Sequence, residues 1–150
     1  MKHDDPIAPS EDELDTLVSI AIRRAELLDE RMPSAARAAW REVMEFEERL
    51  AAISDASEIS GGIARVGAIQ AALAAGLRQD AKQLQTKYLL DKNLSTERKA
   101  AIERAFASDQ ARQALRYPSL ANKGMLARLG ELDTWRMSMA SKPRVFPIAA

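Results

Sequence analysis

Apolar residues recur every three to four positions along most of the chain, which is typical of helices with one buried face. A first helix is predicted to begin after Ser10, because Ser10 and Glu13 have the spacing of a capping box. It is predicted to end near Met32, since Pro33 disfavours a helical residue before it. Its apolar stripe comprises Leu14, Leu17, Val18, Ala21, Ala25 and Leu28, widened by Ile20, Ile22 and Leu27. This width indicates contacts on two sides of the helix.

A second helix is predicted to begin at Pro33 or Ser34. Its expected buried face comprises Ala36, Ala39, Trp40, Val43, Phe46, Leu50 and Ile53. Its expected solvent-facing residues are Glu42, Glu45, Glu47, Glu48 and Arg49. Trp40 and Trp135 both fall within the apolar period of their helices, so packing in the core is favoured over stacking on a ligand.

A third helix is predicted from about Ile63 to Leu90, with a kink near Gly76 and a polar loop before it. Small residues recur every four positions in its first half and would form a ridge that lets another helix approach closely. This ridge comprises Ala64, Ala68, Ala72 and Gly76. Gly61 and Gly62 are interpreted as packing residues at a loose start of the helix.

The same glycine-rich stretch has the spacing of a phosphate-binding loop, but it lacks the residues that this chemistry needs. Such a loop requires a lysine after its second glycine and then a Ser or Thr hydroxyl for magnesium. After Gly67, the corresponding positions hold Ala68 and Ile69. The sequence therefore argues against a nucleotide site of this type.

Ser95 is predicted to cap a fourth helix, in which Ile102, Ala105 and Phe106 are buried. Ser108 is expected to re-cap a short turn that ends at Arg116. A fifth helix is predicted over residues 120–139, with Leu126, Leu129, Leu132 and Trp135 as its apolar residues.

These elements predict an all-α protein, an irregular antiparallel bundle of about five helices with an extended C-terminal tail. The expected organisation is a flexible N-terminal segment over residues 1–9, a helical domain over 10–141 and the tail over 142–150.

The composition of the 150-residue chain agrees with one helical domain and excludes several chemistries. The sequence contains no cysteine, which excludes disulfides, thiolate catalysis and cysteine-ligated zinc. No stretch of 18 apolar residues is present, and the acidic N-terminus has no hydrophobic signal segment. We therefore expect a cytoplasmic protein without a membrane partner.

Few residues suit catalysis or metal binding. His3 is the only histidine and lies in the N-terminal segment, where we expect it to be solvated. Glu42, Glu45 and Glu48 share one helix face, which is interpreted as a solvated surface. Ser119 and Lys123 have a spacing compatible with a Ser-Lys dyad, as do Ser138 and Lys142, but no motif supports either pair. We expect no enzymatic activity, no metal, no cofactor and no small-molecule substrate.

The distribution of charge is the one feature that points towards a partner. Residues 1–75 contain 8 Lys and Arg against 15 Asp and Glu, whereas residues 76–150 contain 14 against 7. Three interpretations are possible. The two halves can pack so that their opposite charges mix over a neutral surface, or the acidic half of one copy can bind the basic half of another copy or of a partner. Alternatively, the basic half can bind along a phosphate backbone. The candidate binding residues are Arg98, Lys99, Arg104, Arg112, Arg116, Arg128, Arg136 and Arg144.

The tail over residues 142–150 contains two prolines and is predicted to be an extended anchor, with Val145, Phe146 and Ile148 as its docking residues. The hypothesis is a non-enzymatic interaction subunit or adaptor of a bacterial or phage-type multiprotein assembly, which binds another protein or copies of itself. One alternative is a nucleic-acid-binding subunit that uses the basic half of the chain. A third possibility is an enzyme with an unrecognised site.

Overall fold

The structure is a computed structural model, and it describes residues 6–116. These residues form five α-helices and no strand, which confirms the predicted all-α fold class. The helices are α1 (Glu11–Arg31), α2 (Pro33–Ile53), α3 (Ile59–Ala74), α4 (Arg78–Leu89) and α5 (Thr96–Arg116). Residues 1–5, the helix predicted over 120–139 and the tail predicted over 142–150 lie outside the described residues.

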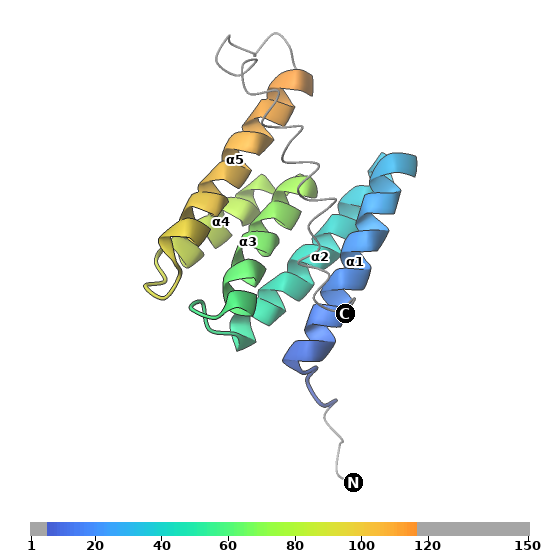
Figure 1. Ribbon diagram of the computed structural model, residues 1–150. Coiled ribbons are helices and arrows are strands. Elements are labelled where there is room, and N and C mark those ends of the chain that lie inside the picture. The colour runs from blue at the N-terminus through green and yellow to red at the C-terminus, as the bar shows by residue number, and fades with distance from the viewer. Residues whose placement is uncertain (1–5, 117–150) are drawn as a thin grey trace.

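The described helices run alternately up and down, and α1 and α5 lie at opposite edges of the bundle (Figure 1). The main packing contacts join α1 to α2, α2 to α3, and α3 to both α4 and α5. Helix α3 is therefore the centre of the described bundle. Its ridge of small residues is confirmed at Ala64, Ala68 and Ala72, which are completely buried.

Local sequence signals set the ends of several helices as predicted. The Ser10 hydroxyl accepts a hydrogen bond from the Glu13 amide at 3.3 Å, and the Glu13 carboxylate accepts one from the Ser10 amide at 2.8 Å. This reciprocal pair is the predicted capping box. Pro33 is the first residue of α2. Ser95 accepts a hydrogen bond from the amide of Arg98 at 3.2 Å and caps α5.

The prediction of one helix over residues 63–90 was wrong, because Gly76 ends a helix instead of bending it. Gly76 has φ of 76°, a left-handed conformation that other residues adopt only with strain. Its amide donates to the carbonyl of Leu73 at 3.0 Å, and the Leu77 amide donates to the carbonyl of Ala72 at 2.9 Å. These two bonds form a Schellman motif, which satisfies the last carbonyls of α3. Gly76 therefore lies outside the small-residue ridge.

The expected re-capping at Ser108 was also wrong, since α5 continues through Ser108 to Arg116. A serine in a helix can leave the backbone hydrogen bonds undisturbed, and the core residues around it keep the helical period. Of the predicted buried residues of α5, Ile102 and Ala105 are fully buried, whereas Phe106 is half-buried.

Two assignments on α2 need correction. Glu47 was expected to face solvent but is completely buried. Ile53 was expected in the core, but 54% of its surface is exposed. Glu47 lies four positions after Val43 and three before Leu50, so it shares the buried stripe of the helix despite its charge. Ile53 is the last residue of α2, and the nearby Ser54 and Ala56 are buried at this end of the bundle instead.

Trp40 is a core residue, as predicted. Its side chain is buried, and its indole nitrogen donates to the carboxylate of Asp29 at 2.8 Å. This hydrogen bond joins α2 to α1 near the turn between them. A buried indole N–H needs such a partner, because an unsatisfied donor would oppose folding.

Candidate functional site

Helix α1 carries an apolar inner stripe and an outer stripe of three apolar and three charged residues, and the two stripes face different directions. Its inner stripe packs against the bundle and comprises Leu14, Val18, Ala21, Ala25 and Leu28. Its outer stripe comprises Glu13, Leu17, Ile20, Arg24, Leu27 and Arg31. Successive members of each stripe are spaced alternately by four and three residues, so each stripe follows one side of the helix. Within the described residues α1 is covered on its inner side, and contact on its outer side stays a prediction.

The outer stripe exposes large aliphatic side chains on an otherwise well-packed helix. Leu17 is 37% exposed, Ile20 is 60% exposed and Leu27 is 55% exposed. Single exposed aliphatic residues are common on protein surfaces, but these three follow one another along a single helix face. Leu17 was predicted in the main stripe with Leu14, because helical periodicity alone does not decide which of two neighbouring apolar positions on the helix faces the core.

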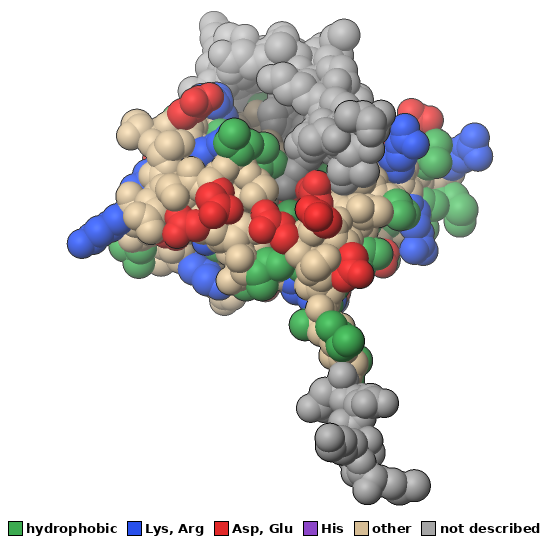
Figure 2. Space-filling model, turned by 60° about the horizontal axis from the view of Figure 1, so that its bottom comes forward, with side chains coloured by type: hydrophobic (Ala, Val, Ile, Leu, Met, Phe, Trp, Pro, Cys, Tyr) green, Lys and Arg blue, Asp and Glu red, His purple; other side chains and the backbone are tan. Residues whose placement is uncertain are grey.

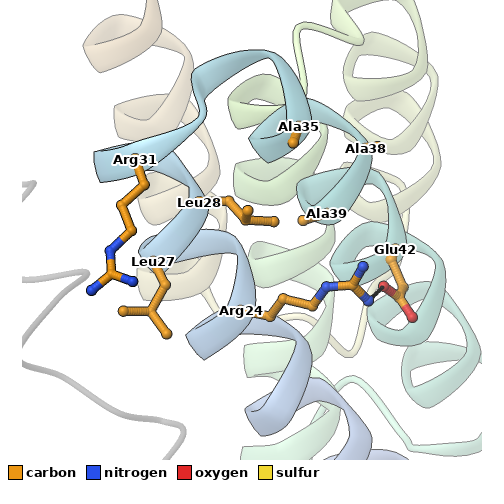
Figure 3. A pocket seen from close by; sticks show the side chains of 8 residues that line it. All are labelled: Arg24, Leu27, Leu28, Arg31, Ala35, Ala38, Ala39 and Glu42. Carbon is orange, nitrogen blue, oxygen red and sulfur yellow. Dashed lines mark hydrogen bonds and ion pairs between the residues drawn. The ribbon is translucent and has the colours of Figure 1, made fainter.

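A groove of about 700 Å³ lies beside the outer stripe, between α1 and α2 (Figure 3). Leu28 points across its floor towards Ala39, whereas Leu27 stands at its edge (Figure 3). The residues lining this α1–α2 groove are Arg24, Leu27, Leu28, Arg31, Ala35, Ala38, Ala39 and Glu42. The groove is hollow because three of the four α2 residues that line it are alanines, which cannot fill the space between the two helices.

Charged side chains border the apolar floor of the groove. Arg24 Nη1 lies 3.4 Å from Glu42 Oε2, which joins the two helices by an ion pair. Both side chains are substantially exposed, so the pair contributes little to stability. Its geometric effect is to draw the guanidinium group of Arg24 towards α2 and leave the aliphatic stem on the outer stripe.

Glu26 is a partly buried acidic residue of α1, one turn before Asp29, which accepts the hydrogen bond from Trp40 of α2. Partial burial raises the pKa of the Glu26 carboxyl, and the nearby Asp29 and Glu30 act in the same direction, against Arg23. Because ionised Glu26 is less favourable in the folded state than in water, its carboxylate opposes folding slightly near neutral pH.

A second cluster of polar groups is buried around Arg65, a residue of the central helix α3. Arg65 Nη1 donates to the carbonyl oxygens of Ser54 at 3.1 Å and Gly61 at 2.8 Å. Its Nε lies 3.7 Å from a carboxylate oxygen of Asp91, and its guanidinium carbon is 5.7 Å from the centre of the Tyr88 ring. These contacts join the end of α2, the start of α3, and the α4–α5 connection.

The Arg65 cluster also changes the proton affinity of Tyr88. Burial raises the pKa of Tyr88 to about 12; Glu48 and Glu47 act in the same direction and Arg65 against them. The hydroxyl is therefore neutral over the physiological range. Arg65 is surrounded by backbone carbonyls, the Tyr88 ring and Asp91, so the cluster links separate segments of the fold. The sequence does not point to this cluster, because Arg65 lies in a stretch of small and apolar residues and belongs to no recognisable motif.

The basic residues predicted on α5 have different surroundings. Arg98 is half-buried, with its aliphatic stem close to Gly62, and Arg104 is exposed. Lys99 and Arg104 are five positions apart, so they point in directions about 140° apart around the helix. Arg112 Nη2 lies 3.7 Å from buried Asp109, which also pairs with Arg78 at 3.0 Å.

Among the described members of the basic set, Lys99 and Arg104 therefore do not share a face of α5, and Arg112 is engaged with Asp109. Arg116 is the last residue of α5. The remaining predicted binding residues lie outside the described residues: Arg128, Arg136, Arg144, Val145, Phe146 and Ile148.

Acidic side chains, in contrast, gather at one end of the bundle. Figure 2 shows Asp and Glu side chains across the lower end, which is turned towards the viewer. The first turn of α1 contributes Glu11, Asp12 and Glu13, where negative charge complements the helix dipole. Asp55 and Glu58 lie in the α2–α3 connection at the same end. The lower end of α1 is therefore negatively charged, whereas its upper end carries Arg31.

Residues 6–116 contain no group of three or more acidic or histidine side chains that is able to hold a metal ion. No helix in this range combines the length and the apolar character needed to cross a membrane. The fold places the described chain in the class of all-α helical bundles. Comparison of the sequence and structure with protein-family models, curated proteins and solved structures finds no match.

Proposed function

We propose that the protein is a non-enzymatic interaction subunit or adaptor of a cytoplasmic multiprotein assembly of bacterial or phage type, and that it docks through the α1–α2 face. We define this face as the outer stripe of α1 together with the α1–α2 groove. The observation that carries the proposal is the second stripe on α1, whose apolar residues Leu17, Ile20 and Leu27 remain exposed although the helix is already packed through its inner stripe.

The form of the face suits a helical partner. An amphipathic helix can lay apolar side chains spaced by three and four residues along a groove with an apolar floor. Burial of a large aliphatic side chain contributes about 1.5–3 kcal/mol, so a few anchors supply useful affinity. The exposed charges beside them, Arg24, Arg31 and Glu42, would select the orientation of the partner.

Nucleic-acid binding through the basic half has weaker support from the described residues. Arg112 is engaged with Asp109, and Lys99 and Arg104 point away from each other. A phosphate backbone is bound best by cations that line a continuous track. A mobility-shift assay at low salt separates the two functions, since a strong shift with duplex or single-stranded nucleic acid would favour the alternative.

Photo-cross-linking in the native host tests the proposed docking face directly. A photoreactive amino acid at position 27 lies on the face, whereas the same amino acid at position 90 provides a matched control at another exposed leucine. We expect discrete cross-linked products from position 27, containing either a second copy or another protein, and none from position 90. Absence of products from position 27 at native expression levels would contradict the proposed function.

A further inference from the structure

We infer that the outer stripe of α1 recognises a second copy of this chain, with the two α1 helices packed antiparallel. This inference rests on the proposed function, because it names the occupant of the docking face. In the proposed pair, Leu17 of each copy faces Leu27 of the other, and Glu13 of each copy faces Arg31 of the other. Three properties of the stripe favour this pair: its spacing, its symmetry under reversal and its charges.

The apolar residues of the outer stripe have the spacing of a helix–helix seam. Leu17, Ile20 and Leu27 are separated by three and seven residues, so they lie on one face of α1, and the charged residues Glu13, Arg24 and Arg31 complete this face at the same spacing. Two helices with such stripes pack side by side with their side chains interlocked. The inner stripe has the same period and already packs against the bundle, so α1 has the geometry of a helix built for two helix neighbours.

The stripe also matches itself when it is turned end to end. In an antiparallel pair centred near Ile22, positions 13, 17 and 20 of one helix face positions 31, 27 and 24 of the other. Each copy then contributes the same contacts, as an interface with twofold symmetry requires. Leucine meets leucine in two layers, and the two ends of the seam bring together an acid and a base. A partner of unrelated sequence would need no such symmetry.

The charges favour the antiparallel direction. Glu13 lies in the first turn of α1 and Arg31 is its last residue, so a parallel pair would bring like charges together at both ends. An antiparallel pair also sets the helix dipoles in opposition. Arg24 would face Ile20 of the second copy, and its ion pair with Glu42 directs its charge away from the seam while its stem covers the isoleucine.

The apolar part of the seam is short, with three aliphatic residues from each copy. An interface of this extent falls at the small end of specific complexes, so we expect reversible dimers that form as concentration rises. Sedimentation equilibrium of the full chain from about 5 µM to about 500 µM covers the range in which a weak dimer assembles. The expected result is an increase in average mass from one chain towards two.

Two leucine substitutions locate the interface. Leu27→Glu places a charge in both leucine layers and should weaken dimerisation at least tenfold. Leu90→Glu makes the same change at a leucine that is 77% exposed on another part of the bundle and should leave the dimer unchanged. Because both leucines are exposed, the thermal melts of the two monomers should be similar. Equal dimerisation of the wild type and the Leu27→Glu variant would overturn the inference.

A charge exchange tests the direction of the helices. Glu13→Arg and Arg31→Glu each set like charges opposite one another at both ends of the seam and should weaken the dimer about three- to tenfold. The double variant restores opposite charges across the interface and should recover most of the affinity. The double variant lacks the Glu13 capping interaction just as Glu13→Arg does, so its recovery cannot come from restored capping. Failure to recover would overturn the antiparallel arrangement.

The outcomes also separate this inference from the proposed function. If the purified chain stays monomeric at the highest concentration while position 27 cross-links to a different protein in the host, self-recognition is wrong and the docking face stands. If the chain is monomeric and position 27 yields no product, both fail.

Discussion

Neighbouring glycines at the start of α3 occupy very different environments. A methyl group on Gly61 would overlap the backbone carbonyl of Asp55, whereas a methyl group on Gly62 would lie 3.4 Å from the carbonyl oxygen of Ala56, an ordinary contact. The Asp55 carboxylate accepts hydrogen bonds from the amide and hydroxyl of Ser57, which hold this turn and keep the pKa of Asp55 below its usual range. The turn can therefore press against α3 only where Gly61 leaves room.

We predict opposite effects for alanine at these two positions. Gly61→Ala should destabilise the protein by about 1–3 kcal/mol, as overpacking against backbone does. Gly62→Ala should be neutral or stabilising by up to about 1 kcal/mol, because alanine favours the helix and its methyl group would make only ordinary van der Waals contacts. Urea unfolding of the two variants measures the difference. Equal stability would show that the turn does not press against Gly61.

At the scale of elements, the ends and the faces of helices follow different rules. The ends of α1 and the start of α5 depend on residues a few positions away, such as Ser10 with Glu13 and Ser95 with Arg98. The break between α3 and α4 is also local, but a glycine in a helical pattern is compatible with a kink or with a stop. The two hydrogen bonds around Gly76 decide for a stop.

The left-handed conformation of Gly76 gives a prediction at this scale. Gly76→Ala should reduce stability by about 1–2 kcal/mol, which is the approximate cost of this conformation for a residue with a β-carbon. No atom lies within 4 Å of the position of that carbon, so a steric clash adds nothing. Gly76→Asn is the matched control and should cost less, because asparagine tolerates the conformation better. Thermal or urea unfolding checks the order; equal costs for both variants would contradict it.

At the scale of the whole molecule, the described halves of the chain share some charges instead of separating them completely. Arg65 of the first half lies beside Asp91 of the second, and within the second half Arg78 and Arg112 surround Asp109. The Arg65 cluster also connects α2, α3 and the α4–α5 connection through one buried side chain. Global stability should therefore respond to the ionisation of Tyr88, whose ring packs against Arg65.

Tyr88 provides the clearest pH dependence. Its pKa is about 12 in the folded state against an ordinary value near 10, so above pH 10 the unfolded chain releases this proton more readily. Stability should fall as pH rises from about 10 to about 12, by up to about 2–3 kcal/mol from this group. Tyr88→Phe should remove that part of the fall. The measurement is the free energy of unfolding of both proteins at several alkaline pH values.

A parallel pH dependence in the wild type and the Tyr88→Phe variant would contradict the burial of the hydroxyl. Absorbance at 295 nm gives an independent control, since the wild-type spectrum should contain a phenol that titrates near pH 12 and is absent from the variant.

The candidate site was only partly predictable from the sequence. The width of the apolar surface on α1 indicated contacts on two sides, and the structure shows two stripes there. Whether Leu14 or Leu17 faced the bundle was not decided, because both fit the same helical period. The groove was not foreseen, since it depends on alanines of α2 lying opposite α1. The predicted binding residues on α5 were selected by their positive charge, and charge alone does not indicate which side of the helix a residue faces.

The sequence by itself determined the fold class and most of the helix ends, because capping residues, prolines and helical periodicity act between residues close along the chain. Only the tertiary structure decided that Glu47 is buried, that Leu17 and Leu27 are exposed, and that Arg65 braces three segments. The physical reason is that burial depends on which distant helix lies against a given face. The polarity of a side chain favours burial or exposure, but the neighbouring helices decide whether that side chain is buried.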